Sequence, residues 1–332
     1  MRIAPPSHIS PESLGMTGDM NDSPSKHHFS PAFSNKPWAF NDNQQLCEMK
    51  LVNGIVAPRR CHPNATGHQK HLYTTVGVAP EHEQHLEVTF MKPLDTAAAL
   101  VLTKILSGEI ANLDEDQCIA WTRYILSLWF RGTEVVREIR DHMREMWGEA
   151  LHGVGVEELY AAECKPDDPE TVEEFFSQAR PAAAEIAATN MIGEVIDNGR
   201  VGPDILKMRW ARVLVKNTKV QLLNSDRPIE RPYSLRDPRA FIAFPISPYA
   251  IFLASNDMSF ITRVTLADHT KIAKAMNKIV VSQAREFVWG ADDSQIAFVR
   301  KHMGRAPRKP VIDDKGRAEA IAAARGERTA SI

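Results

Sequence analysis

The sequence lacks the features that define several large classes of proteins. Its four cysteines show no Cys-x-x-Cys spacing, so they predict free thiols rather than a disulfide framework. The longest apolar runs, such as AAALVL at 97–102, are much shorter than the roughly 18 residues of a membrane span. Prolines and charges interrupt the first 26 residues, so we expect neither a signal peptide nor a membrane helix, and we predict a cytoplasmic protein.

The chain also lacks a charge excess of one sign. Its 40 Lys and Arg balance 42 Asp and Glu, for a formal net charge of −2, so no global field draws it to nucleic acid or an anionic membrane. A local contact with nucleic acid stays open, but the net charge does not signal one. There is no phosphate-binding P-loop, no Gly-x-Gly-x-x-Gly and no Gly-x-Ser-x-Gly, which disfavours P-loop nucleotide hydrolysis and ordinary serine hydrolysis.

What is present is the composition of a globular protein with tails. Hydrophobic residues make up 43% and charged residues 25% of the chain, which is ordinary for a folded domain. Residues 1–25 are rich in Ser, Pro, Gly and Met and predict a disordered leader. We expect one domain over 26–292 and a basic tail over 293–332, largely disordered or partly helical, because residues 301–332 carry eight Lys and Arg against four Asp and Glu.

The periodicity of the domain predicts an α+β fold. Two half-apolar runs flank Asn53-Gly54, a dipeptide typical of a type I′ hairpin turn. From about residue 84 to 210 the pattern is helical, and Asp114 with Gln117 resembles a capping box. After residue 210 short strand-like runs return, then a helix at about 266–285 and a strand at EFVWG. We therefore expect a helical middle with short antiparallel strands contributed by the N- and C-terminal segments.

Several short motifs occur in a recognisable order. They are HHFSPAF at 27–33, PRRCHPNATGHQKHLYT, HLEVTFMKPLDTAAA, an arginine at 131 that closes an apolar helix, NSDRPI, FPISP and AMNKIVVSQAREFVWG. Together they resemble domain-of-unknown-function family 4238 over about residues 26–292. The chain has Ser34-Asn35 where Tyr-Leu is common in that family, and Asn224 where threonine usually precedes the Ser-Asp-x-Pro motif. The resemblance implies a shared architecture, but no established reaction.

The adjacent histidines are the first candidates for a site. If HHFSPAF is a strand, alternation places His27 on an apolar face with Phe29 and Phe33, and His28 on the opposite face. His27 is then a satisfied core histidine. His28 is the better functional candidate, with anchoring of a loop as its structural alternative.

The other candidates have equally plain structural alternatives. Arg131 could bind a phosphate or carboxylate with two nitrogens, or form a buried ion pair. Asp226 follows a predicted strand, where it could face a cleft or only cap a turn. Glu87 and Asp95 flank the start of a helix, and an N-cap role for Asp95 is favoured over catalysis. The remaining supporting candidates are Ser225 and Asn277.

These residues support two hypotheses of different classes. In the first, the protein is a hydrolase, in its narrower form directed at a phosphodiester, with His28 as base, Asp226 orienting it or a metal, and Arg131 stabilising negative charge. In the second, it is a non-catalytic recognition or interaction domain in which the same residues order loops. A divalent metal is compatible with the first, but nothing in the sequence requires one. The histidines between residues 62 and 85 are dense but do not predict zinc, because zinc requires converging geometry.

Overall fold

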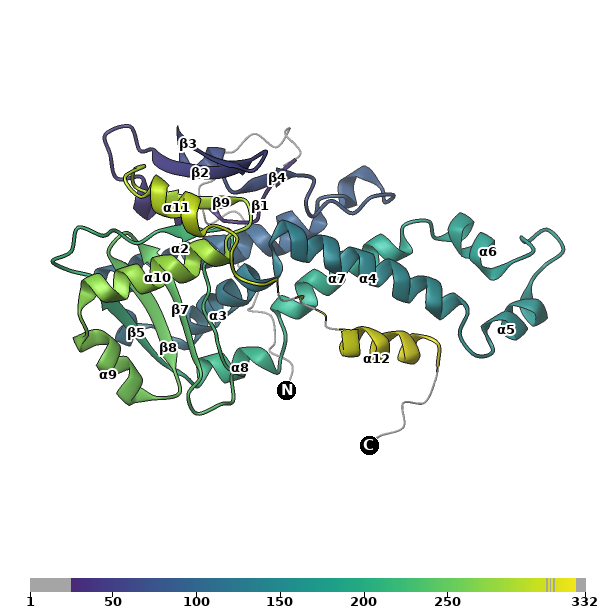
Figure 1. Cartoon of the computed structure of the whole chain (residues 1–332). Coiled ribbons are helices and arrows are strands. Elements are labelled where there is room, and N and C mark those ends of the chain that lie inside the picture. The colour runs from purple at the N-terminus through teal and green to yellow at the C-terminus, as the bar shows by residue number, and fades with distance from the viewer. Residues whose placement is uncertain (1–24, 309, 311, 313, 327–332) are drawn as a thin grey trace, which may run out of the picture.

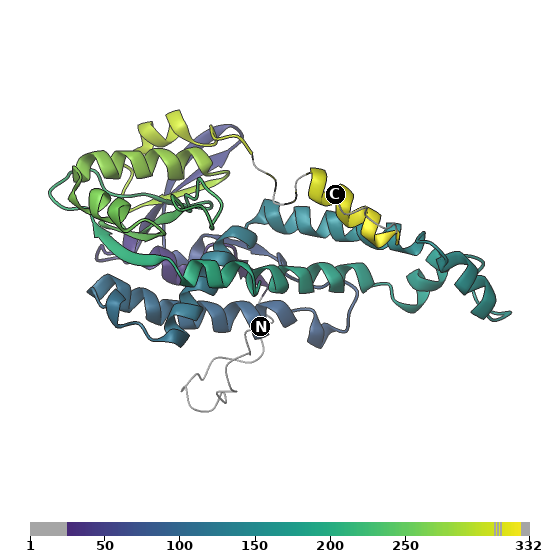
Figure 2. The same ribbon diagram turned by 90° about the horizontal axis from the view of Figure 1, so that it is seen from below.

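The computed structural model describes residues 25–308, 310, 312 and 314–326. It shows a body of small sheets and helices, from which two long antiparallel helices project as an arm (Figures 1 and 2). The fold is α+β, as the sequence predicts. Apart from Ser25, the expected leader lies outside the described residues. Within the described part of the chain, no helix is both long and apolar enough to cross a membrane.

The first sheet joins the two ends of the domain. Its strand order is β3-β2-β9-β6, with β2 at Leu46–Val52, β3 at Ile55–Cys61, β6 at Asn224–Ser225 and β9 at Phe287–Gly290. The β2–β3 hairpin turns at Asn53-Gly54, where both residues have positive φ angles of 49° and 79°, as a type I′ turn requires. Because β9 pairs antiparallel with both β2 and β6, N-terminal and C-terminal segments meet in one sheet, as expected.

The second sheet lies between two layers of helices. Its order is β5-β8-β7, with β5 at Arg209–Leu214, β7 at Phe241–Ser247 and β8 at Ala250–Ser255. Strand alternation gives the sheet two apolar faces. On one face Ala243 and Leu253 pack with Ile261 and Met276 of α9 (Met258–Leu266) and α10 (His269–Gln283). The single helix expected at 266–285 is thus α10, which starts where the Asp268 carboxylate accepts the backbone N–H of Lys271.

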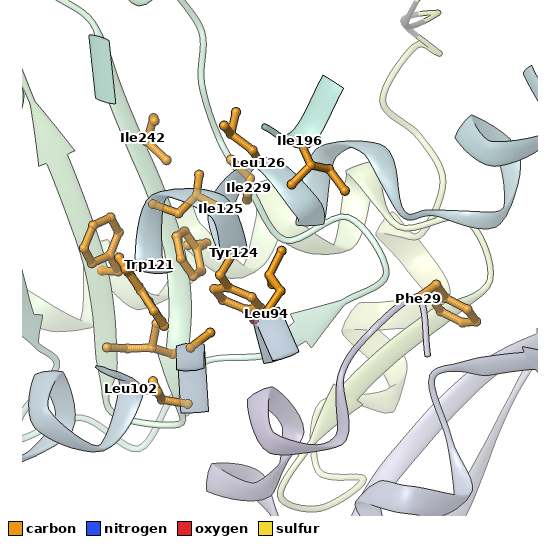
Figure 3. Close-up of a cluster of buried hydrophobic side chains, with 14 of the residues drawn as sticks. Phe29, Leu94, Leu102, Trp121, Tyr124, Ile125, Leu126, Ile196, Ile229 and Ile242 are labelled. Atoms are coloured by element: carbon orange, nitrogen blue, oxygen red, sulfur yellow. The ribbon is translucent and has the colours of Figure 1, made fainter. Parts of the chain in front are cut away.

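The opposite face of this sheet covers the largest core (Figure 3). Trp121 and Tyr124 of α3 (Glu115–Phe130) pack on Phe244 and Phe252, with Trp121 stacked at 6.0 Å between ring centroids on Phe244. Leu94 and Leu102 reach the same core from α2 (Lys92–Ser107). The predicted capping box at the start of α3 is present, since Asp114 and Gln117 each bond the other's backbone N–H.

The arm and the C-terminal segment are helical. The arm consists of α4 (Thr133–Leu151) and α7 (Ala183–Ile196), with α5 (Val156–Glu163) and α6 (Val172–Ala179) at its tip; α8 (Val201–Leu206) follows. After β9 come α11 (Ile296–His302), which buries Val299, and α12 (Asp314–Ala324), which lies along α4. The four cysteines are free, as expected.

The N-terminal motif folds differently from the expected strand. Only Lys26–His28 forms a strand, β1, which pairs with β4 (His68–Lys70). The chain then bends, and α1 (Ala32–Asn35) begins directly after Pro31. Proline is compatible with a helix start, where a missing N–H costs nothing, but not with a ladder that needs that donor. Phe33 therefore does not share a strand face with His27. Short helical turns complete the fold at Lys36–Trp38, Pro63–Ala65, Pro80–His82 and Ile110–Asn112.

Candidate functional site: a buried polar cluster around Arg131

The two adjacent histidines point to different environments. His27 is fully buried and stacks on Tyr73 with ring centroids 5.3 Å apart. Its Nδ1 accepts the backbone N–H of Tyr73 at 2.7 Å, and its Nε2 lies 2.7 Å from the side-chain oxygen of Gln84. Both ring nitrogens are thus engaged with protein groups, so His27 holds β1 against the segment that leads to α2. This matches the expected core histidine, with Tyr73 rather than Phe33 as its ring partner.

His28 lies on the other face of β1. Antiparallel pairing places it opposite His68, and the two imidazole centroids are 5.5 Å apart. The backbone of Asn64 hydrogen-bonds the ring, while Nε2 is buried with no hydrogen-bond partner among the described residues. Burial, followed by the nearby His68 and Arg131, lowers the pKa of His28 from 6.5 to about 4. At neutral pH the imidazole is therefore uncharged, and one of its two ring nitrogens has a lone pair that can accept a proton or bind a metal.

Arg131 is the residue around which the other candidates gather. It closes α3 and its side chain is 1% exposed, yet it forms a two-point ion pair with Asp95, with N–O distances of 2.7 and 3.0 Å. Burial opposes the charge, but Asp95 outweighs burial and raises the pKa of Arg131 above its ordinary value. The expected N-cap role of Asp95 is wrong, because α2 begins at Lys92 and has no side-chain cap. Asp95 instead faces α3 and balances Arg131.

Glu87 approaches the same place from a rare local structure. Residues Glu87–Met91 form a π-helix that runs directly into α2. Its wider turns are uncommon and frequently occur at functional sites. The Glu87 side chain is buried, and Oε2 has no partner among the described residues. Burial raises the pKa of Glu87 from 4.5 to about 7, against the opposing pull of Arg131. Near neutral pH this carboxyl group is partly protonated and can donate a proton.

Tyr73 connects these groups. Its hydroxyl donates to the carbonyl of Arg131 at 3.0 Å and lies 3.4 Å from the carbonyl of His28, so the main chains at His28 and Arg131 are neighbours. Burial raises the pKa of Tyr73, so the hydroxyl keeps its proton. We call this group the Arg131 cluster, and it comprises His28, His68, Tyr73, Glu87, Asp95 and Arg131.

The Arg131 cluster stands out by its unsatisfied atoms. Twelve buried side-chain nitrogen or oxygen atoms of the described residues have no hydrogen-bond partner, and four of them belong to it: His28 Nε2, His68 Nδ1, Glu87 Oε2 and Arg131 Nε. Leaving a buried polar atom unpaired costs about 1–3 kcal/mol. Such atoms are rare in folded proteins and call for an explanation such as a ligand or a catalytic role. Their concentration here marks a candidate site.

The carboxylate of Asp226 is engaged by main-chain groups of another segment, although it lines a small cavity together with Phe29 and Gly132. Its carboxylate accepts backbone N–H groups of Arg285, Glu286 and Phe287, at 2.7 to 3.2 Å. Burial raises the pKa of Asp226 from 3.8 to about 6, and these bonds oppose the shift. The bonds fix the loop that leads into β9. The expected role of Asp226 as the orienting partner of His28 has no hydrogen bond to support it among the described residues.

Two supporting candidates also bind main chain. The Ser225 hydroxyl donates to the carbonyl of Val280 and accepts the backbone N–H of Arg227. The amide of Asn277 accepts the N–H of Leu223 and donates to the carbonyl of Gln221. Both residues tie α10 to the strand segment around β6. Their chemistry is used in holding segments together.

The histidine side chains between residues 62 and 85 do not converge on a common site. His62 caps the turn at Pro63–Ala65 by accepting the N–H of Asn64, and His71 lies 3.3 Å from the hydroxyl of Thr74. Across residues 25–308 and the described positions beyond, no group of three or more His, Cys, Asp or Glu side chains could hold a metal ion. Sequence reasoning missed two members of the Arg131 cluster, Tyr73 and His68. The pairing of β1 with β4 that brings them in has no local signal.

The fold is thus α+β, and the polar cluster is built from the N-terminal strand segment and the first helices of the helical middle. The chain belongs to the family described as Protein of unknown function (DUF4238), whose model matches residues 26–294. This confirms the resemblance found in the motifs. Searches of curated proteins and of solved structures gave no significant match.

Proposed function

We propose that the protein is a hydrolase that uses general acid–base catalysis at the Arg131 cluster. The observation that carries the proposal is the set of four unpaired buried polar atoms on His28, His68, Glu87 and Arg131. It is supported by opposite pKa shifts, to about 4 for His28 and to about 7 for Glu87. Environments that separate the pKa values of two titratable groups are a common way to assign an acid and a base.

In this mechanism His28 is the base and Glu87 is the acid. Water attacks the scissile centre and transfers a proton to Nε2 of His28, while the carboxyl group of Glu87 gives its proton to the departing oxygen. Arg131 and Asp95 act as a fixed pair that holds the two elements in place. Tyr73 positions the main chains of the two segments. This assignment replaces Asp226 with Glu87 as the carboxyl partner.

The narrower hypothesis of a phosphodiester substrate requires a cation facing the phosphate. Both terminal nitrogens of Arg131 already bond Asp95, so its charge is largely balanced before a substrate arrives. Of its three side-chain nitrogens, only Nε has no hydrogen-bond partner within the described structure. The geometry therefore favours an uncharged ester or glycoside over a phosphodiester.

We propose that the protein is cytoplasmic, because four unpaired cysteines suit a reducing compartment.

The experiment is a panel of chromogenic substrates: p-nitrophenyl acetate, p-nitrophenyl glycosides and bis(p-nitrophenyl) phosphate. His28→Gln and Glu87→Gln should each lower kcat/KM for the active substrate by about 10²–10⁴-fold, the usual contribution of acid–base catalysis. Glu163→Gln on the exposed surface of α5 and Asp226→Asn are the controls, and should retain activity wherever they remain folded. Equal losses in Asp226→Asn and His28→Gln, with both folded, would restore the original assignment.

A second function is favoured by a separate observation. Four of the motif residues use their polar side-chain atoms to hydrogen-bond other segments of the chain: His27, Ser225, Asp226 and Asn277. That is the expected pattern for a recognition or interaction domain in which the motif residues order loops. A folded protein that turns over no substrate of the panel, with or without added divalent metals, would support this second function.

A further inference from the structure

A groove on the other side of the π-helix is separate from the Arg131 cluster. It lies between residues 75–90 and α7, and its volume is about 590 Å³. Sites for small organic ligands commonly span about 300–1,000 Å³ and combine an apolar lining with a few polar groups. Leu86 and Phe90 supply the apolar wall on one side and Ile186 on the other. The groove is therefore of the size and composition of a small-molecule site.

The wall of the groove on α7 includes a glycine. Gly193 of α7 faces Leu86 and Phe90, and a Cβ atom placed on it would lie 3.7 Å and 4.0 Å from their side chains. These are ordinary van der Waals distances, so alanine fits without displacing its neighbours. A longer side chain would extend beyond this contact and fill the space. A small residue at this position therefore leaves the groove unfilled.

The groove has two carboxylates in its lining. Among the described residues that line it are Glu194 and Asp197, together with His82 and His85, and there is no Lys or Arg. Asp197 is already paired with Arg123 at 2.6 and 3.0 Å, and Arg123 also lies 5.1 Å from the centre of the Phe90 ring. Glu194, one turn earlier on α7, is exposed, and its carboxylate makes no ion pair or hydrogen bond within the described structure. The groove thus presents one unbalanced carboxylate beside an apolar wall.

We propose that this groove binds a small organic cation with an apolar or aromatic body. The body packs on Leu86, Phe90 and Ile186, and an ammonium or guanidinium group faces Glu194. Burial of apolar surface supplies most of the affinity, and the carboxylate supplies selection by charge. The site is independent of the proposed hydrolase activity, because its lining contains no member of the Arg131 cluster. Ligand binding to it can also be measured without turnover.

Three matched probes test the proposal on the full chain: 2-naphthylmethylammonium, 2-naphthalenemethanol and 2-naphthoate, titrated by calorimetry at low salt. The ammonium should bind about two- to fivefold more tightly than the alcohol, the size expected for an exposed ion pair, and the carboxylate should bind most weakly. Glu194→Gln should abolish the difference between ammonium and alcohol. The same difference should shrink in 0.5 M NaCl, because salt screens exposed charges.

Two glycine variants test the location. Gly193→Leu should weaken all three probes at least tenfold, whereas Gly193→Ala should leave them nearly unchanged. A melting temperature no lower than that of the native protein in both variants excludes unfolding as the cause, and Glu194→Gln still tests the location if the leucine variant does not fold. Glu163→Gln is the control for a distant exposed carboxylate. Equal affinity for all probes, no binding, or an undiminished preference in Glu194→Gln would overturn the proposal.

Discussion

Replacing Glu87 with glutamine should change how stability depends on pH. Burial raises the pKa of Glu87 from 4.5 to about 7, so between these values the folded chain binds a proton that the unfolded chain does not. The stabilisation is complete below pH 4.5 and is lost as pH rises through about 7. The shift is equivalent to about 3 kcal/mol. Because glutamine does not titrate, the free energy of unfolding of Glu87→Gln should rise relative to that of the native protein by up to about 3 kcal/mol between pH 4.5 and pH 8.

His28 should show the opposite sign. Its pKa falls from 6.5 to about 4 in the folded chain, so its stabilisation is present above pH 6.5 and is lost as pH falls through about 4. Between pH 6.5 and 4.5 the two groups therefore compensate each other in the native protein. Single variants remove this compensation. As pH falls, the stability of His28→Gln should increase relative to the native protein, whereas the stability of Glu87→Gln relative to the native protein should decrease from its value at pH 8.

The assay is urea unfolding followed by the fluorescence of the six tryptophans, at several pH values between 5 and 8. The midpoint should move between variants while the slope with urea stays constant, since no change in exposed surface is expected. Glu163→Gln, on the exposed surface of α5, should run parallel to the native protein. If the difference in stability between Glu87→Gln and the native protein were the same at pH 5 and pH 8, the account of Glu87 as a buried, proton-binding group would be refuted.

Three further outcomes follow from contacts in the fold. Asp226→Asn should cost about 1–3 kcal/mol of stability by calorimetry, because it weakens three backbone bonds in the loop before β9; an unchanged melting temperature would contradict this. Asp95→Asn should cost about 3 kcal/mol, and the double variant Asp95→Leu/Arg131→Met should cost less, since an unpaired buried charge is worse than none. α12 has no buried residue, and ion pairs of Arg317 with Glu145 and of Arg325 with Glu149, each at 2.6 Å, hold this segment to α4. Replacing both glutamates with glutamine, or adding 1 M NaCl, should speed amide exchange in α12 and leave the melting temperature of the domain unchanged.

Sequence reasoning succeeded where the signal is local. Asn53-Gly54 identifies a hairpin because few dipeptides accept two positive φ angles. Asp114 and Gln117 identify a helix start because both partners of the capping box lie within four residues. The α+β class follows from such local features added along the chain. The alternation that places His27 and His28 on opposite faces is also local, and it held for the three residues of β1.

Sequence reasoning failed where a partner is distant. Asp95 carries every local feature of a helix cap, yet its partner Arg131 lies 36 residues away on another helix. The π-helix at Glu87–Met91 has no pattern that distinguishes it from the first turn of α2. Tyr73 enters the cluster only because β1 pairs with β4. Tertiary packing decides each of these features, and hydrophobic periodicity does not encode it.

The motifs at the two ends of the chain need not form one site in order to recur together. Asp226 fixes the approach to β9, and Asn277 holds α10 to the segment before β6. Both act on the sheet in which N-terminal and C-terminal strands meet, so any chain with this topology needs such anchors, whatever its chemistry. A residue that belongs to a motif can therefore be one that connects two segments of the fold just as readily as a catalytic residue. Unpaired buried atoms are a stricter criterion, because a connecting residue satisfies its polar groups and a site must leave some for its ligand. By that criterion His28 and Glu87 are better candidates for the proposed chemistry than Asp226 and Asn277, which have no unpaired buried atom among the described residues.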